Sequence, residues 1–483
     1  MQNITFGIIG GLGMLAGADL FLKLVKSRAV MADQGRYHFL FEQYPFRDVA
    51  MPLVCDASMT GRKLHVFKTC QFFEGRNVDA VLMPCFASHT FRDELQAELA
   101  MPIVNILDAL QSAFNDTLHE GETIGVLASD FVRHARLFDD RFGERFKIIY
   151  PTEAMQSSLM AAVYGPSGIK AGYTDGLCLE QVYGACQELV DGGADLIVPG
   201  MTELSLVISA LRRRGVPISD VNQVYADYAA TSVNRHVNRG YKLGIVGGVG
   251  PAATVDFMGK IVKNTPASKD QDHIKMVVEQ NPQIPDRTAH LLRDEADPTI
   301  ALYATCKRLE AEGASAIAIP CNTAHAYIEC IQPHLSVPIV DMLSETVQHI
   351  VRKYGKGTRV GLLATSGTLE SGVYHAAADG QLELIVPSSE FQQRVMDAIY
   401  GADGVKAGYT EGRCAAHLHA AIAHLQSSGA AVQILGCTEL PLIFAQSDAF
   451  DLGSGATVAL VDPTDVLAKC CVQIAQPTGE QGK

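Results

Sequence analysis

The chain has 483 residues, of which 48% are apolar and 19% charged, and its formal net charge is −14. This length and composition are typical of a globular protein with more than one domain. The acidic balance, without a basic run, argues against nucleic acid or an anionic membrane as a partner. No apolar run reaches the length of about 18 residues that a membrane span needs, and the N-terminus lacks the basic segment of a signal peptide.

Short apolar runs alternate with longer helical patterns along the whole chain. The predicted strands cover 4–10, 79–83, 123–128 and 194–198 in the first half, and 243–247, 315–319, 359–364 and 431–435 in the second. This alternation predicts α/β units in which helices cover parallel sheets. Ligands of open α/β sheets bind beyond the carboxyl ends of the strands, so we expect the functional residues there.

The two halves repeat one another in a register that is constant to within one position. "GIIGGLG" at 7–13 returns as "GIVGGVG" at 244–250, and "PCFASHTF", which begins at Pro84, returns as "PCNTAHAY", which begins at Pro320. "VYGPSGIKAGYTDG" from Val163 matches "IYGADGVKAGYTEG" from Ile399 at the same spacing. The chain is therefore a tandem duplication. We place the first unit at 1–238, the second at 239–477 and a disordered tail at 478–483.

The glycine-rich segment that opens each unit invites a nucleotide-binding interpretation. "GIVGGVGPAAT" has the spacing G-x-x-G-G-x-G, and no acidic residue closes a clear second strand about 20 residues later. The sequence favours instead a tight turn from strand to helix that lines a small-molecule pocket.

Twelve cysteines are present, without a C-x-x-C pair or a Cys/His set at zinc spacing. This pattern favours reduced thiols in a cytoplasmic protein without a metal centre. Cys321 follows a predicted strand and precedes a predicted helix, and Cys437 lies at a similar strand end. One such cysteine is more often a packing residue, whereas two facing a common pocket suit proton exchange at carbon by two bases.

The second half resembles the cofactor-independent aspartate/glutamate racemases. The motifs that carry the resemblance are "PCNTAH", "GCTEL", "EQNPQIPDRT", "ATSGT" and "GVKAGYTEG". They occur together, and the resemblance covers essentially the whole chain as two family units. It implies two α/β subdomains per unit with the site in the cleft between them. It also implies an amino-acid racemase that uses no pyridoxal cofactor and acts on aspartate or glutamate.

The resemblance implies roles for individual residues of the second half. Cys321 and Cys437 match the two acid/base cysteines, whose roles swap with the handedness of the substrate. The expected substrate-binding residues comprise the groups that hold the α-carboxylate, Asn322, Thr323, Thr365 and Thr438, and the cations for the distal carboxylate, Arg287 and Lys406. Donors aimed at the α-carboxylate stabilise the charge that builds when the α-proton leaves, and a guanidinium suits carboxylate recognition.

Several of these residues also have a structural interpretation. Without the motif, Arg287 is equally well a solvated surface charge. Lys406 has an in-register partner in Lys170, and the pair indicates either a site or a shared structural contact. For Glu439 and its counterpart Glu203, a carboxylate at a helix N-terminus is the favoured interpretation. His325 and His89 also match one another, and we expect them to orient the cysteine loops.

The first half departs from the family pattern. Cys85 corresponds to Cys321, but Met201 stands where Cys437 is expected, and methionine cannot carry the proton. Further changes affect the carboxylate-binding positions and the loop around Arg47: Phe86, Ala87 and Ser129 replace Asn322, Thr323 and Thr365, and Arg47 is out of register with Arg287. We therefore expect Cys85, Lys170 and Met201 to mark a degenerate site in a unit that no longer racemises and serves as a built-in dimer partner.

Alternatives remain open at this point. Cys85 can act as a single base on a less polar ligand, given Phe86. The chain can catalyse a related isomerisation or decarboxylation of a dicarboxylate, or it can be a non-catalytic amino-acid sensor. The presence of both Cys321 and Cys437 weighs against the last two. A fused pair is compatible with a monomer or with a further homodimer.

Overall fold

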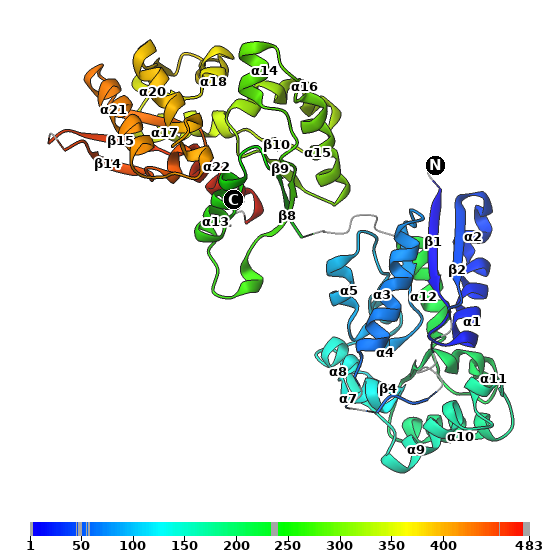
Figure 1. Ribbon diagram of the computed structural model, residues 1–483. Helices are drawn as coiled ribbons and strands as arrows, with labels where there is room; N and C mark the ends of the chain where they lie inside the picture. The colour runs from blue at the N-terminus through cyan, green and yellow to red at the C-terminus, as the bar shows by residue number, and fades with distance from the viewer. Residues whose placement is uncertain are drawn as a thin grey trace. The chain divides into compact units, whose positions relative to one another are not determined.

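The computed structural model divides the chain into two compact units, Met1–Arg239 and Gly240–Lys483, each of which is an α/β structure (Figure 1). The structure describes residues 3–44, 46, 51–54, 56, 58–232, 240–453 and 455–476. The expected boundary near residue 238, the expected tail at 478–483 and Arg47 lie outside the described residues. No helix in the described ranges is long and apolar enough to cross a membrane.

The first unit contains two three-stranded parallel sheets, with strand orders β2-β1-β3 and β5-β4-β6. The strands are β1 (Ile4–Ile9), β2 (Tyr37–Glu42), β3 (Ala80–Leu82), β4 (Thr123–Ala128), β5 (Lys147–Ile149) and β6 (Leu196–Gly200). The α-helices are α1 (Met14–Lys26), α2 (Arg28–Ala32), α3 (Thr60–Glu74), α4 (Phe86–His89), α5 (Arg92–Glu98), α6 (Ile106–Thr117), α7 (Asp130–His134), α8 (Leu137–Phe142), α9 (Glu153–Tyr164), α10 (Leu177–Asp191), α11 (Ile208–Arg213) and α12 (Val221–Ser232).

The second unit repeats this plan with larger sheets, of strand orders β10-β9-β7-β8 and β12-β11-β13-β15-β14. Its strands are β7 (Lys242–Gly247), β8 (Lys275–Gln280), β9 (Ala316–Ala318), β10 (Ile339–Val340), β11 (Thr358–Ala364), β12 (Leu382–Ile385), β13 (Val432–Gly436), β14 (Ser447–Asp451) and β15 (Thr457–Val461). Its α-helices are α13 (Pro251–Asn264), α14 (Arg287–Arg293), α15 (Thr299–Ala311), α16 (Ile328–Ile331), α17 (Met342–Tyr354), α18 (Ser366–Glu370), α19 (Val373–Ala378), α20 (Ser389–Tyr400), α21 (Arg413–Ser427) and α22 (Pro463–Ala475).

All eight predicted strands are present, and the α/β class with parallel sheets is confirmed. Among the described strands, only β14 runs antiparallel, within a hairpin with β15. The strands that the sequence did not predict lie mostly at sheet edges. An edge strand is less covered by other elements, so its sequence can mix apolar and polar residues. The sequence "KMVVEQ" of β8, for example, does not stand out as an apolar run.

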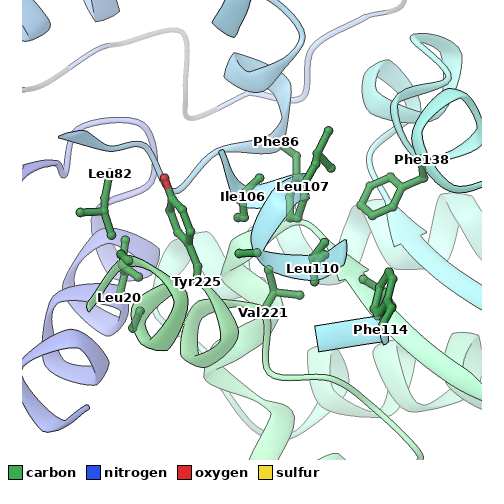
Figure 2. Close-up of a cluster of buried hydrophobic side chains, with 14 of the residues drawn as sticks. Leu20, Leu82, Phe86, Ile106, Leu107, Leu110, Phe114, Phe138, Val221 and Tyr225 are labelled. Atoms are coloured by element: carbon green, nitrogen blue, oxygen red, sulfur yellow. The ribbon is translucent and has the colours of Figure 1, made fainter. Parts of the chain in front are cut away.

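The core of the first unit forms where helices α1, α6 and α12 pack on the sheet that contains β1 and β3 (Figure 2). Tyr225 of α12 is fully buried there, and its hydroxyl donates to the Val104 carbonyl at 2.6 Å and accepts from the Met83 N–H at 3.1 Å. Burial of such apolar surface stabilises the fold by roughly 25 cal/mol per Å². The two hydrogen bonds satisfy the one polar atom that Tyr225 brings into this core.

Helix α1 and helix α12 are also joined by ionic contacts at their edges. Lys23 of α1 lies 2.8 Å from Asp19 and 2.7 Å from Asp220. In the second unit Lys260 of α13 pairs in the same way with Asp256 and with Asp462, which caps α22. The duplicated contacts fix the first and last helices of each unit against one another.

Several of the helices that follow a strand begin with a side-chain cap. Thr365 follows β11 and accepts from the Thr368 N–H, and Ser129 follows β4 and accepts from the Val132 N–H. Asp341 caps α17 by accepting from the N–H groups of Leu343 and Ser344. Such caps satisfy backbone donors at a helix start and hold the capping side chain at the carboxyl end of its strand.

Candidate active site

Cys321 and Cys437 line the same cavity in the second unit. Cys321 follows β9 of one sheet, and Cys437 directly follows β13 of the other. The cavity therefore lies between the two subdomains of the unit, as the family resemblance implies. It has an empty volume of about 280 Å³ and is lined by Val249, Arg287, Thr288, Cys321, Asn322, Thr323, Thr365, Tyr400, Lys406, Cys437, Thr438 and Glu439. All eight expected site residues of this unit are brought together there.

The chain after Cys321 differs from the sequence prediction. Instead of a long helix, it forms a 3-10 turn, η6 (Thr323–Tyr327), followed by the four-residue α16. A turn this short has little of the macrodipole that a long helix has, so it adds little positive potential at Cys321. The charge beside Cys321 comes instead from a side chain.

That side chain is Arg287, at the start of α14. It is buried, and it donates to the carbonyls of Pro285 at 3.0 Å and Val249 at 3.2 Å, while its Nε has no partner among the described residues. Burial opposes its charge, but Cys321 and Asp286 hold the pKa of Arg287 above its usual value. Arg287 is therefore a buried cation beside Cys321 and not a solvated surface residue.

Cys437 has a different partner, the carboxylate of Glu439. The Cys437 thiol donates to Glu439 Oε2 at 3.0 Å, and Lys406 Nζ contacts Glu439 Oε1 at 2.7 Å. Burial and the Glu439 charge raise the pKa of Cys437 well above its usual value. Lys406 and the Cys437 thiol hold the pKa of Glu439 below its usual value, although burial opposes this. Glu439 therefore keeps the Cys437 proton in place, a role beyond the helix-end carboxylate that the sequence favoured.

Four buried threonine hydroxyls gather on the side of the cavity formed by α14, η6 and α18. Thr323 lies 2.7 Å from Thr368, Thr365 lies 3.0 Å from Thr368, and Thr288 donates to Thr365 at 3.2 Å. A hydroxyl can rotate to donate or accept, so such a cluster can donate to a carboxylate. Thr438 contacts Glu439 Oε2 at 3.3 Å instead and belongs to the group around Cys437.

Asn322 adds a fixed amide to the same wall. Its Oδ1 accepts from the Tyr374 hydroxyl at 2.6 Å, which sets the orientation of the amide. Its Nδ2 is buried and has no partner within the described part of the chain. Burying a hydrogen-bond donor without a partner costs free energy, so this atom is suited to donate to a ligand oxygen.

The glycine-rich turn after β7 lies against this cavity. Gly250 has a φ of +124°, and a Cβ there would lie 2.5 Å from Glu439 Oε1. Val249, beside it, lines the cavity, and its carbonyl accepts from Arg287. The turn thus brings backbone close to a carboxylate side chain, which agrees with the pocket-lining interpretation.

The two matching histidines hold the cysteine loops. His325 Nδ1 lies 2.9 Å from the Cys321 carbonyl, and its Nε2 accepts from the Met342 N–H at 3.1 Å. Nε2 must therefore be unprotonated, so Nδ1–H donates to the carbonyl. His89 makes the same two contacts in the first unit, and burial lowers its pKa to about 4. Both are neutral positioning residues.

The first unit has a cavity at the equivalent place, and it contains Cys85, Lys170 and Met201. Lys170 pairs with Glu203 at 2.7 Å, as Lys406 pairs with Glu439. Arg62 of α3 donates to Cys85 Sγ at 3.5 Å. Arg62 therefore stands beside its cysteine as Arg287 does beside Cys321, although the two arginines do not match in sequence register.

Sequence reasoning missed several residues of the two sites: Thr288, Thr368, Tyr374, Tyr400, Glu439 in its proton-holding role, and Arg62. The threonines and Tyr400 lie in or beside the quoted motifs, so the sequence contained a signal that could have identified them. Tyr374 and Arg62 carry no local signal, because they reach their sites from helices outside those motifs.

Comparison with known proteins identifies the family of the chain. A model of the Asp/Glu/Hydantoin racemase family matches residues 9–229 and again 246–471. The broad specificity amino-acid racemase RacX of Bacillus subtilis (strain 168) is 32% identical over 163 residues, which make up 32% of this chain and 69% of that protein. The glutamate racemase of Corynebacterium glutamicum is 30% identical over 164 residues, which make up 34% of this chain and 56% of that protein. Among solved structures, the aspartate racemase of Picrophilus torridus has a TM-score of 0.41 at 28% identity, covering 49% of this chain and 94% of that chain.

The family model covers most of the chain in two successive matches. The chain belongs to the Asp/Glu/hydantoin racemase family, with two family units in tandem. The class of protein that fold and family define is an amino-acid racemase.

Proposed function

We propose that the second unit racemises an amino acid with Cys321 and Cys437 as its two bases. The observation that carries this proposal is that the two buried thiols line one cavity from different sheets, each with its own charged partner. The buried Arg287 guanidinium is the charged partner of Cys321, whereas the Cys437 thiol donates its proton to the Glu439 carboxylate. In the proposed assignment, Cys321 acts as the base and Cys437 as the acid for one enantiomer.

In the proposed reaction, the Cys321 thiolate takes the α-proton from one face of the substrate. The electron pair of the broken C–H bond passes into the α-carboxylate, and the Cys437 thiol then gives its proton to the opposite face. The enzyme is left with a thiol at Cys321 and a thiolate at Cys437, the form that accepts the other enantiomer. Lys406, beside Glu439, limits the repulsion between that thiolate and the carboxylate.

The α-carboxylate is expected to bind at the polar wall of the cavity. The Asn322 Nδ2 donor and the hydroxyls of Thr323 and Thr365 are buried and already oriented by neighbouring contacts. Donors fixed in advance stabilise the charge that develops on the carboxylate without further reorganisation. The distal carboxylate of aspartate or glutamate would bind at Arg287, whose Nε has no partner among the described residues.

A broader amino-acid specificity is the second candidate. Lys406 was expected to bind the distal carboxylate, but it is paired with Glu439 at 2.7 Å and brings no net charge. Arg287 is then the main cation for an acidic side chain, and it also faces Cys321. A site with so little net positive charge favours acidic substrates less strongly, which suits a racemase that accepts several amino acids.

For the first unit, we propose that it does not racemise. Met201 replaces the second base, and the cavity keeps only Cys85. The unit would instead serve as an intrachain partner of the second, in a cytoplasmic protein. A single-thiol isomerase or decarboxylase and a sensor remain as outcomes of the test below, but neither explains why a second proton donor is buried at Cys437.

The test follows α-proton exchange by NMR in heavy water. L- and D-aspartate, L- and D-glutamate and L-alanine are offered separately to the full chain and to the Cys321→Ser and Cys437→Ser variants. We expect each variant to lose racemisation and to keep proton exchange on one enantiomer only, the opposite one in each case. Alanine turnover comparable to that of aspartate would favour the broad-specificity candidate.

Cys330→Ser is the matched control, because Cys330 is exposed and lies outside the cavity. Its activity should equal that of the unaltered chain. Equal exchange on both enantiomers in either cavity variant would contradict the two-base assignment. The absence of exchange on every amino acid in the unaltered chain would favour the sensor.

A further inference from the structure

The cavity of the first unit combines charged and polar lining residues with apolar ones. It has an empty volume of about 420 Å³, against about 280 Å³ in the second unit. Its polar lining residues are Arg62, Cys85, Ser129, Tyr164, Lys170, Thr202 and Glu203, and its apolar ones include Leu12, Leu53, Phe86, Ala87, Val132 and Met201. The cavity thus keeps a buried cation, Arg62, beside its remaining cysteine.

The replacement of polar by apolar residues is coordinated. At positions that match in the register of the repeat, the first unit has Phe86 for Asn322, Ala87 for Thr323, Val132 for Thr368, Phe138 for Tyr374 and Met201 for Cys437. Asn322 and Tyr374 form a hydrogen bond, whereas Phe86 and Phe138 pack together with ring centroids 5.2 Å apart (Figure 2). Both members of the pair have changed together, so the apolar wall is packed rather than left with unpaired polar atoms.

Arg62 provides a place for an anion. Its side chain is only 6% exposed, Nη1 donates to Cys85 Sγ at 3.5 Å, and Nε is buried without a partner among the described residues. No carboxylate pairs with Arg62 in the part of the chain that the structure describes. A buried guanidinium without a carboxylate is costly, and a bound carboxylate would relieve that cost by accepting hydrogen bonds from it.

Several of the other polar groups have partners within the unit. Lys170 pairs with Glu203, the Ser129 hydroxyl accepts from the Val132 N–H at 3.4 Å, and the Thr202 hydroxyl donates to the Pro84 carbonyl at 3.0 Å. The amide and the two hydroxyls that Asn322, Thr323 and Thr368 provide in the second unit are replaced here by Phe86, Ala87 and Val132, so fewer acceptors are left for a buried ammonium group. A ligand with a carboxylate but no α-amino group fits this cavity better than an amino acid does.

We propose that the cavity of the first unit binds a small carboxylate that carries an apolar group and no α-amino group. Arg62 holds the carboxylate beside Cys85, and the apolar group lies along Phe86, Val132 and Met201. The first unit is thus a second binding site with a ligand class of its own, independent of which amino acid the second unit accepts.

The experiment uses the full chain and reads the two sites separately. Iodoacetamide alkylates a thiolate by forming a C–S bond with loss of iodide, and peptide masses report the rates at Cys85 and Cys321 in one sample. Isovalerate, L-valine, D-valine and L-aspartate are added at millimolar concentrations. Valine differs from isovalerate by the α-amino group alone and is the matched control ligand.

We expect isovalerate, at about ten times its dissociation constant, to slow alkylation of Cys85 by about tenfold because it occupies most of the sites, while Cys321 is unaffected. Valine and aspartate should leave Cys85 unprotected. Protection of Cys85 by valine or aspartate equal to that by isovalerate, or no protection by isovalerate, would overturn the proposal. Because Cys321 is read independently, failure of the racemase assignment would appear as a lack of protection there by any amino acid.

Two variants test the assigned residues. Arg62→Met should abolish protection by isovalerate, whereas Arg76→Met, at an exposed arginine just beyond α3, should not. The double variant Phe86→Asn, Phe138→Tyr restores a polar pair in the wall and should weaken protection by isovalerate. Undiminished protection in Arg62→Met would contradict the anion site.

Discussion

The Glu439 carboxylate contacts two groups of the site, the Cys437 thiol and the Lys406 ammonium group. One carboxylate oxygen accepts from Cys437, and the other pairs with Lys406. The Cys437 proton is therefore held by a negative charge, while the thiolate that remains after its transfer lies close to a positive one. The in-register pair Lys170 and Glu203 persists in the first unit, where Met201 replaces the second thiol. The ion pair is thus present in both units, with and without a second thiol beside it.

Replacing Glu439 by glutamine should lower the pKa of Cys437. The charge of Glu439 raises that pKa at present, so its removal favours the thiolate, and the unpaired Lys406 adds to the effect. We expect the midpoint of Cys437 alkylation by iodoacetamide to move to lower pH by about one unit or more, because a buried charge next to the thiol is removed. A shift of one unit corresponds to about 1.4 kcal/mol. Peptide masses over a pH series provide the measurement.

Glu329→Gln is the control for this experiment, since it removes the same charge at an exposed position outside the cavity. It should leave the midpoint unchanged. A Cys437 midpoint that stays in place in Glu439→Gln would mean that burial alone sets the acidity of this thiol.

At the scale of elements, the turn between β7 and α13 decides whether Glu439 can take its position. Gly250 has a φ of +124°, which only glycine adopts readily, and a Cβ there would lie 2.5 Å from Glu439 Oε1. Gly13 stands at the same place in the first unit, and a Cβ there would lie 2.8 Å from Glu203 Oε1. The repeated glycine segments therefore serve a close approach between backbone and carboxylate.

Gly250→Ala should displace Glu439 and strain the turn. We expect a loss of stability of about 1–2 kcal/mol from the backbone conformation, together with a lower alkylation midpoint for Cys437. Gly259→Ala, in α13 with open space around it, should instead stabilise the unit by roughly 0.5–1 kcal/mol. Scanning calorimetry compares the two, and equal unfolding temperatures would contradict the close approach.

Much of this arrangement could be predicted from the order of elements in the sequence. The constant register of the repeat revealed the duplication. The apolar runs located eight strands, and two of these strands are followed by Cys321 and Cys437. The edge strands escaped because half-exposed sequences lack a clear pattern. Arg62 escaped because it reaches Cys85 from helix α3, at a sequence position that does not match that of Arg287. Only the fold brings such residues together.

For the whole molecule, the proposal that the first unit is a built-in partner can be tested on the second unit alone. If the first unit serves as that partner, the second unit should not remain a stable monomer when it is produced alone. We expect residues 240–483 to form homodimers or to aggregate, as measured by light scattering coupled to size exclusion. A monodisperse, fully active monomer would contradict the partner role. The full chain, measured in parallel, is the reference for activity.

The packed pair of Phe86 and Phe138 limits how mutation can convert the site of the first unit into that of the second. Changing only one member to its counterpart would leave an amide or a hydroxyl buried against a phenyl ring, at a cost of about 1–3 kcal/mol. Changing both restores a hydrogen bond of the kind that joins Asn322 and Tyr374. The two positions are therefore expected to show strong epistasis, and a double-mutant cycle should give a favourable coupling energy. Transplanting the amino-acid site into the first unit must begin with this pair, before Met201 is exchanged for cysteine.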